Sequence, residues 1–553
     1  MRWLRFLVVA LTLDLALTVR PGLKIERGRL SRLFQSLLAQ EVQADWIQVQ
    51  DGTNTTVKGE LAPESCLQCN GAFLNYFSAL QTARRPNLVA FCIFIVGTIL
   101  TWLMMDTAQL FFLPALFYWS KRLRLSPEMA AATLLAVGNG APDMADAVAA
   151  AQLQDLPLGL SDLGGANLCC MSLGNCLCLL VAYTVDPSSK SAVLQHRGHY
   201  LVLLVFYSGA IVLLAVILQK AAINFWHLCT LPALYAVFLL YLSARNRLEE
   251  DVEENRRSNS RRSSSTHVAI EDAMACLSPP ETESWQASFA WALLLPFTLM
   301  RMATIPPCDL QWDPARRVFH AMCPTGLYCL CRLLGYVPAP DFNIGVATAA
   351  ALVLTTVVIF LTGGTRSSKM SGSSLPWFYN VMTLLALVSS MLWLSALSDE
   401  ITASLEGLCH FYKISRLRSG FTLLAWGNCA GDLVAAYSIS LMGEFSLAFN
   451  GLVASQFFNT AVGFSTALMT VTWKHADIIL FPNGWPSDIS HPLLACAIAI
   501  LLVVITLAVF SLVDLHVRSP CWGAVLAANY VVFFIYMWRS TSVDVPHQLA
   551  TAG

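Results

Sequence analysis

Thr133-Leu-Leu-Ala-Val-Gly-Asn-Gly-Ala-Pro-Asp143 returns 289 residues later as Thr422-Leu-Leu-Ala-Trp-Gly-Asn-Cys-Ala-Gly-Asp432. Eight of the eleven positions are identical, and each copy places an aspartate inside an apolar segment. A charged side chain at the centre of a membrane helix costs about 2.5–3.5 kcal/mol on insertion scales, and such residues mark ion or proton pathways. The neighbouring glycine, proline and asparagine favour an interrupted helix, which transporters with internal repeats use to bind ions near the midplane. The duplication therefore predicts a cation site made of two similar halves.

The composition is that of a membrane protein. Of the 553 residues, 56% are hydrophobic and 12% are charged, and the mean hydropathy is +0.59. Too few polar residues are present to cover a soluble globule of this size, so we expect an all-α polytopic membrane protein. The net charge of −1 indicates no nucleic-acid partner. Most of the 17 cysteines stand in apolar runs and are expected to act as small hydrophobic residues, and we predict no cofactor.

The N-terminal part of the chain predicts a signal-like segment and then a polar region. Residues 1–20 place two arginines before a short apolar run, which is typical of a secretory signal or a signal anchor. The region 21–87 contains the glycan acceptor Asn54, which indicates an external or luminal face. In the same region, Cys66 and Cys69 are expected to form a disulfide, or half of a metal site.

Apolar stretches long enough to span a bilayer follow from residue 88 onward. We expect one repeat at 88–243 and a second at 376–540, with a hydrophilic loop at 244–285 and connecting spans at 286–375 between them. The apolar stretches lie at about 88–118, 128–152, 157–184, 197–218, 222–243, 286–305, 317–337, 342–362, 376–397, 416–441, 446–471, 490–514 and 521–538. If the two repeats are inverted, two of the three connecting stretches span and the third, our candidate being 317–337, lies at the interface. The expected total is about twelve spans: five, two extra and five.

The residue types of the repeated phrase point to a hard cation. Ca²⁺ and Na⁺ take oxygen ligands from carboxylates, amide side chains and free backbone carbonyls. Asp143 and Asp432 supply two negative charges, which would neutralise one Ca²⁺. Further side-chain ligands are predicted at Asn139, Asn428, Asn459, Thr133, Thr422, Asn167 and Gln456. Helix breaks that turn backbone carbonyls toward the ion are predicted at Gly138, Gly140, Pro142, Gly427 and Gly431. The alternative is a polar contact that only holds the helices together.

The loop at 244–285 predicts a regulatory segment. Its arginine-rich run precedes or surrounds Ser258, Ser263 and Ser264, so a protein kinase is a candidate partner. Phosphate added there would reverse the local charge. The alternative is a disordered, solvated linker. If the N-terminal region lies outside, the basic residues that flank the spans place this loop inside.

The two phrases also carry a family resemblance. Gly138-Asn-Gly-Ala-Pro-Asp143 and Gly427-Asn-Cys-Ala-Gly-Asp432 resemble the two alpha repeats of the calcium/cation antiporter superfamily. Their aspartate form is similar to the cation/calcium exchanger branch, the branch of the mitochondrial sodium/calcium (lithium) exchanger. This resemblance implies the sodium/calcium exchanger fold, with two inverted five-helix repeats, alternating access, and Asp143 and Asp432 as acidic ligands. It also implies Asn139, Asn428 and Asn459 as polar ligands.

Two departures from the family pattern concern carboxylates. The family usually has a serine three residues after the first aspartate, where this chain has Asp146. After the second aspartate the family has Ser-Asp, where this chain has Ala435-Ala436. Residues three apart share a helix face, so Asp146 is either another ion ligand or a salt-bridged outlier.

The predicted function is a cation antiporter, not an enzyme, that exchanges Na⁺ for Ca²⁺ across the lipid bilayer, with Li⁺ as a further coupling candidate. K⁺- or H⁺-coupled exchange of a divalent cation is the alternative, because the coupling ion depends on fine geometry. A remote alternative is an intramembrane aspartyl protease with Asp143 and Asp432 as its dyad. Its typical Gly-x-Gly-Asp and later Pro-Ala-Leu motifs are missing at and after the second aspartate. The resemblance favours the mitochondrial inner membrane, whereas the signal-like start and the glycan acceptor favour the plasma membrane or endomembranes.

Overall fold

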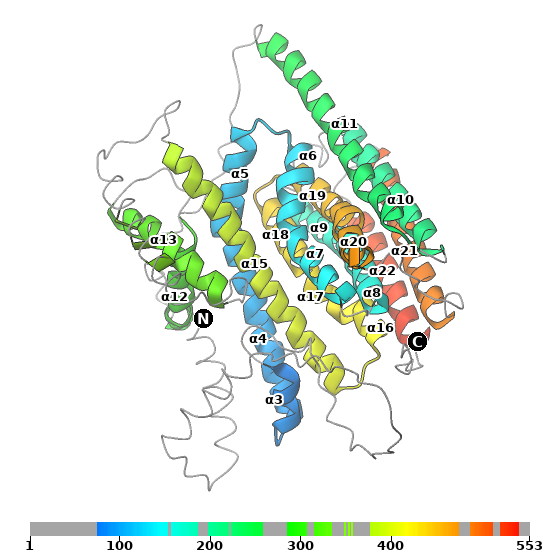
Figure 1. Ribbon diagram of the computed structural model, residues 1–553, viewed down its shortest axis with the longest axis horizontal. Helices are drawn as coiled ribbons and strands as arrows, with labels where there is room; N and C mark the ends of the chain where they lie inside the picture. Colours follow the sequence, from blue (N-terminus) through cyan, green and yellow to red (C-terminus); the bar gives the residue numbers. More distant parts are fainter. Residues whose placement is uncertain are drawn as a thin grey trace.

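The structure of the chain is a computed structural model (Figure 1). It describes residues 75–152, 156–185, 197–220, 223–257, 285–306, 314–333, 348–349, 352–353, 356–357, 377–474, 487–512 and 520–540. Within these ranges the regular structure is helical and no strand is formed. The bilayer core offers no water to backbone N–H and C=O groups, so an apolar chain forms helices, which satisfy these groups internally. The prediction of an all-α polytopic membrane protein is confirmed.

The first half of the chain starts with a long rod of stacked helical segments and continues with the first acidic phrase. Its elements, where η denotes one π-helical turn, are α3 (Tyr76–Thr82), α4 (Pro86–Thr107), η1 (Ala108–Phe112), α5 (Leu113–Arg122), α6 (Pro127–Ala130), η2 (Ala131–Leu135), α7 (Ala136–Gln152), α8 (Leu156–Cys169), η3 (Cys170–Gly174), α9 (Asn175–Val185), α10 (Arg197–Leu218) and α11 (Phe225–Arg257). Helix α11 thus continues into the residues that were predicted as the start of the 244–285 loop.

The second half repeats this order after two connecting helices. Its elements are α12 (Trp285–Thr304), α13 (Pro314–Leu333), α15 (Trp377–Phe411), α16 (Arg416–Ser419), η5 (Gly420–Leu424), α17 (Ala425–Asn428), α18 (Ala430–Leu441), α19 (Phe445–Phe458), η6 (Asn459–Gly463), α20 (Phe464–Lys474), α21 (Ser487–Leu512) and α22 (Pro520–Ser540). Helix α15 is much longer than the predicted span at 376–397, so it carries two acidic residues, Asp399 and Glu400, within its length.

The two repeats run in opposite directions. In Figure 1, α6 and α7 descend, whereas α16, α17 and α18 ascend beside them. The irregular turns also recur at the offset of the duplicated phrase, because η2 and η5 begin at residues 131 and 420, and η3 and η6 begin at residues 170 and 459. Single π turns are rare and often lie at functional sites. The backbone therefore shows the duplication independently of the side chains.

A helix cap before each repeat shows the same correspondence. Arg124 (φ 53°) and Lys413 (φ 55°), which are 289 residues apart, are the non-glycine residues with positive φ in the part of the chain that the structure describes. Each lies just after a helix, and the next backbone N–H bonds a carbonyl five residues earlier at 2.9 Å. This is the Schellman cap, in which a left-handed residue ends the helix. It turns the chain sharply into α6 in one repeat and into α16 in the other.

Seven helices of the described chain are long and apolar enough to cross a membrane. These are Pro86–Arg122, Gly159–Thr184, Arg197–Leu218, Phe225–Asn246, Asn380–Phe411, Ser490–Leu512 and Cys521–Arg539. The acidic helix α7 and the helix pair α19–α20 are absent from this set. Helix α19 is buried at every residue from Phe445 to Phe458, including its polar ones. Its polar side chains therefore face protein and not lipid, as expected for a helix at the centre of a bundle.

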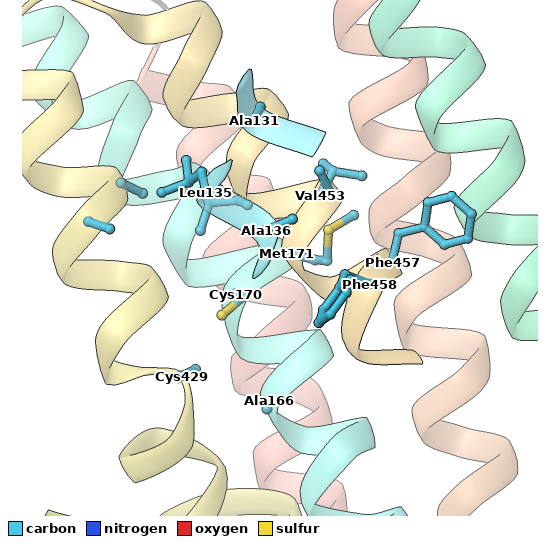
Figure 2. Packing of buried hydrophobic residues seen from close by; sticks show 14 of the residues in the cluster. Ala131, Leu135, Ala136, Ala166, Cys170, Met171, Cys429, Val453, Phe457 and Phe458 are labelled. Atoms are coloured by element: carbon cyan, nitrogen blue, oxygen red, sulfur yellow. The ribbon is translucent and has the colours of Figure 1, made fainter. Parts of the chain in front are cut away.

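The core of the bundle forms where α19 crosses the first repeat. Figure 2 shows Leu135 and Ala136, at the junction of η2 and α7, beside Val453 of α19 and Met171 of η3. At this crossing a side chain at Gly451 would overlap the end of Leu135. Small residues let membrane helices approach closely, and van der Waals packing then holds them together.

The connecting helix α12 is attached to the first repeat by a buried charge. Arg301 is 1% exposed, and its guanidinium lies 2.6 Å from the carboxylate of Asp106 in α4. It also donates to the Thr107 hydroxyl at 3.1 Å and lies 5.8 Å from the ring centre of Phe111. A buried charge is tolerated when it is paired and hydrogen-bonded in this way. The pair fixes α12 against the end of α4, next to the π turn η1.

Candidate ion-binding site

The two aspartates of the duplicated phrase lie at different places in their helices. In the second repeat α17 ends at Asn428, Cys429 interrupts the helix, and Asp432 stands in the first turn of α18. A helix N-terminus favours a negative charge there. In the first repeat α7 runs without interruption from Ala136 to Gln152, through the phrase and Asp143. The helix break predicted at Gly138, Gly140 and Pro142 is therefore not formed, and the break in the second repeat lies one residue after Asn428.

The glycines of the phrase make room for side chains of neighbouring helices and do not interrupt their own helix. A side chain at Gly140 would overlap the Asn459 amide oxygen and come 2.5 Å from Cδ1 of Phe458. A side chain at Gly427 would come 2.5 Å from the Thr402 hydroxyl, and one at Gly138 would come 2.8 Å from the end of a methionine in α15. Only Gly431 faces open space. Glycine is therefore needed where another helix carries its polar side chains up to the phrase.

Each aspartate is contacted by the first residue of a π turn in the opposite repeat, η6 for Asp143 and η3 for Asp432. The Asn459 amide donates to the carboxylate of Asp143. At the equivalent place, the Cys170 thiol lies 3.7 Å from the carboxylate of Asp432. The 289-residue offset relates Asp143 to Asp432 and Cys170 to Asn459, so the two contacts form one geometry that occurs twice. The carboxylates thus lie at the interface between the antiparallel repeats.

Asp432 is the more enclosed of the two carboxylates. It is 3% exposed, and it accepts hydrogen bonds from the Ser455 hydroxyl at 2.8 Å and from the Gln456 amide at 2.7 Å. The Asn139 side chain lies near enough to interact with the same carboxylate. Hydrogen bonds to a carboxylate are short and strong, and several of them together fix its position inside the protein. Asp143 is half-buried in comparison.

A cavity of about 40 Å³ lies on the Asp143 side of this interface. Its polar lining comes from both repeats: Asp143, Asp162, Asn428, Gln456 and Asn459. Within the described residues, the Gln456 Oε1, Asn459 Oδ1 and Asp162 Oδ1 atoms are buried and accept no hydrogen bond. A cavity of this size holds a small ion or a few waters. Carboxylate and amide oxygens without protein donors are the ligands that Ca²⁺ and Na⁺ prefer.

Asp162 is a cavity residue that the sequence reasoning missed. It lies in α8, and the Asn428 amide donates to its Oδ2 atom. The duplication does not point to it, because the equivalent position in the second repeat is Gly451 and not a second carboxylate. An acidic residue within an otherwise apolar stretch was the available signal.

Other predicted ligands make different contacts. The hydroxyls of Thr133 and Thr422 donate to backbone carbonyls one turn earlier, at 2.6 and 2.7 Å, and neither residue lines the cavity. They stabilise the start of the π turns. Asn167 donates to the Thr460 hydroxyl at 3.0 Å, so it links α8 to η6. Asp146 lies on α7, but its side chain is outside the described residues.

Several predictions concern parts of the chain that the structure does not describe. The glycan acceptor, the cysteine pair and the serines of the loop all lie outside the described residues. They are Asn54, Cys66, Cys69, Ser258, Ser263 and Ser264.

The chain is similar to several known proteins. The family model of the sodium/calcium exchanger protein matches residues 89–244 and 382–539, the two segments that contain the acidic phrases. Cation/calcium exchanger 2 of Arabidopsis thaliana is 28% identical over 430 residues, which cover 73% of this chain and 75% of that protein. The mitochondrial sodium/calcium exchanger protein of Homo sapiens is 23% identical over 512 residues, or 84% of each chain. Among solved structures, the sodium-calcium exchanger NCX_Mj is similar with a TM-score of 0.40 and 11% identity, over 80% of this chain and 96% of that chain.

The family model covers more than half of the 553 residues. The intramembrane protease considered above is therefore excluded, and the protein is an integral membrane transporter and not an enzyme. The chain belongs to the family of the sodium/calcium exchanger protein.

Proposed function

We propose that this transporter moves Ca²⁺ and Na⁺ in opposite directions across its membrane. The observation that carries the proposal is the cavity between the antiparallel repeats, whose polar lining includes Asp143, Asn428, Gln456 and Asn459. Both ions prefer oxygen ligands and have similar radii, so one set of carboxylate and amide oxygens suits either. Two carboxylates balance one Ca²⁺, and they balance two Na⁺ equally well.

Alternating access follows from the inverted repeats. The site lies between two halves of similar structure and opposite direction, and rocking of one half against the other opens such a site to each side in turn. The cross-repeat contacts, from Asn459 to Asp143 and from Cys170 to Asp432, are those that such a movement would remake. The name of the human relative supports Na⁺ as the coupling ion.

The test is transport by the purified protein in Ca²⁺-loaded vesicles. External Na⁺, Li⁺, K⁺ or a pH step is added separately, and Ca²⁺ efflux is measured. We expect efflux with Na⁺, and its loss in Asp143→Asn and Asp432→Asn. Glu444→Gln, which changes a carboxylate in the turn between α18 and α19, is the matched control and should transport as the parent does. Efflux with K⁺ or a pH step but not with Na⁺ would reject Na⁺ coupling, and no efflux from folded protein would reject the exchanger.

We also propose the mitochondrial inner membrane as the location. The similarity to mitochondrial sodium/calcium exchanger proteins of several animals supports it. The plant cation/calcium exchangers are similarly close, and their names give no compartment. Fractionation of cells that express the tagged chain tests the proposal. Recovery with inner-membrane markers and resistance to a glycosidase are expected, whereas a glycosidase-sensitive protein in plasma-membrane fractions would reject it.

A further inference from the structure

The carboxylate of Asp162 breaks the symmetry of the two repeats at their interface. Asp162 of α8 corresponds at the 289-residue offset to Gly451 of α19. The second repeat has no space for a side chain at that place, since one would overlap Leu135. The first repeat therefore contributes an acidic group to the interface that has no counterpart in the second.

The two equivalent asparagines of the phrase, Asn139 and Asn428, face different carboxylates. The Asn139 side chain lies near enough to Asp432, across the interface, to interact with its carboxylate. The structure shows its counterpart, Asn428, donating to Asp162. The Thr402 hydroxyl of α15 donates to the Asn428 amide oxygen at 3.1 Å, which turns the amide N–H group toward Asp162. This orientation holds Oδ2 of Asp162 in place and leaves Oδ1 without a donor among the described residues.

The cavity lies on the side of this added carboxylate. Asp143 and Asp162 both line it, whereas Asp432 does not and is instead held by several donors. Gln456 lies between Asp432 and the cavity. Its amide N–H group donates to Asp432, while its buried Oε1 accepts no hydrogen bond from the described chain. Gln456 is fully buried and lines the same cavity, so its free oxygen is a second observation that points to a cation.

We propose that Asp162 is a third carboxylate of the transport site, and that the divalent ion lies between Asp143 and Asp162 with the Gln456 carbonyl oxygen as a further ligand. The inference rests on the proposed function and determines where in the interface the ion binds. The two cavity carboxylates balance the charge of one Ca²⁺, and Asp432 is held by its own hydrogen-bond donors. The site is thus displaced from the symmetry axis toward α8. Glu406 of α15, which is near enough to interact electrostatically with Asp162, adds to the negative potential on that side.

The experiment compares Asp162→Asn and Asp162→Glu with the parent protein in the same vesicles. Binding of a divalent ion depends on the number of charged ligands, so we expect the KM for Ca²⁺ to rise by about tenfold or more in Asp162→Asn. Asp162→Glu keeps the charge and should stay closer to the parent. Asn428→Ala, which removes the donor but not the carboxylate, should give a smaller rise than Asp162→Asn. Glu444→Gln again serves as the control.

The outcomes separate this inference from the proposed function. If Asp143→Asn abolishes transport while Asp162→Asn keeps the parent's KM for Ca²⁺, the exchanger stands and the placement of the ion is wrong. An effect of Asp162→Asn on the KM for Na⁺ alone would equally reject a divalent ion at this residue. A parent protein that moves no cation would reject the proposed function itself. If Asp162→Asn fails to fold, Ca²⁺ titration of Asn428→Ala by calorimetry decides, and an affinity equal to that of the parent would overturn the inference.

Discussion

Gly140→Ala is the most direct test of how the repeats meet. The added methyl group would overlap the Asn459 amide oxygen and lie 2.5 Å from Cδ1 of Phe458, where ordinary contact begins at 3.4 Å. The helix that carries these side chains must therefore move by about 1 Å, and overpacking of this kind costs about 1–3 kcal/mol. Replacing glycine by alanine inside a helix returns up to about 1 kcal/mol, so the protein should still fold.

Transport should be far more sensitive to this substitution than folding. The displaced Asn459 can no longer donate to Asp143, and a hydrogen bond to a charged group is worth about 1.5–3 kcal/mol. That energy corresponds to about a 10- to 150-fold rise in the KM for Ca²⁺. The assay is Na⁺-driven Ca²⁺ efflux from vesicles at several Ca²⁺ concentrations, with the thermal midpoint as a check of folding. Gly97→Ala, in α4 with nothing within 4 Å, is the control. A parent-like KM in Gly140→Ala would refute the close contact between the repeats.

Three further substitutions or treatments test other contacts. Arg301→Met should lower the free energy of unfolding by up to about 3 kcal/mol, because it leaves the half-buried carboxylate of Asp106 without its partner. A double variant with Asp106→Asn should recover part of this loss in thermal unfolding. The sulfur atoms of Cys169 and Cys429 lie 3.1 Å apart across the repeats, so a thiol oxidant should join them as a disulfide and stop transport. A reductant should restore transport, and Cys429→Ser should be insensitive; oxidant-resistant transport by the parent would contradict this. Tyr76→Phe removes a 2.5 Å hydrogen bond to the buried Glu400 of α15, so it should lower the free energy of unfolding by about 1.5–3 kcal/mol. The measurement is chemical unfolding, and a midpoint equal to that of the parent would contradict the prediction.

The sequence predicted the parts of the fold that depend on composition and repetition. The apolar spans follow from hydropathy, and the offset of 289 residues brings Asp143 and Asp432 to one interface. These features are properties of the pattern and need no knowledge of packing distances.

Packing decides what the sequence did not predict. Glycine next to an aspartate was interpreted as a helix break, but Gly140 and Gly427 are instead the places where Asn459 and Thr402 press against the phrase. Thr133 has a typical ligand side chain, yet its hydroxyl bonds its own backbone. The duplication did not point to Asp162, because the equivalent position is Gly451, where close packing against Leu135 allows no side chain.

The recurrence of the π turns and of the left-handed caps has a historical consequence. A backbone irregularity that stands at the same place in both halves was present before the halves became different. The ancestral half-chain therefore already had these turns, and two copies facing in opposite directions would have formed an interface with two identical carboxylates. Two differences arose later: Asp162 stands opposite a glycine in the other repeat, and Asn459 stands at the position equivalent to Cys170. The second repeat has the polar residue Asn459, and the first repeat has the additional acidic residue Asp162. The two halves therefore differ in chemistry although their backbones are alike.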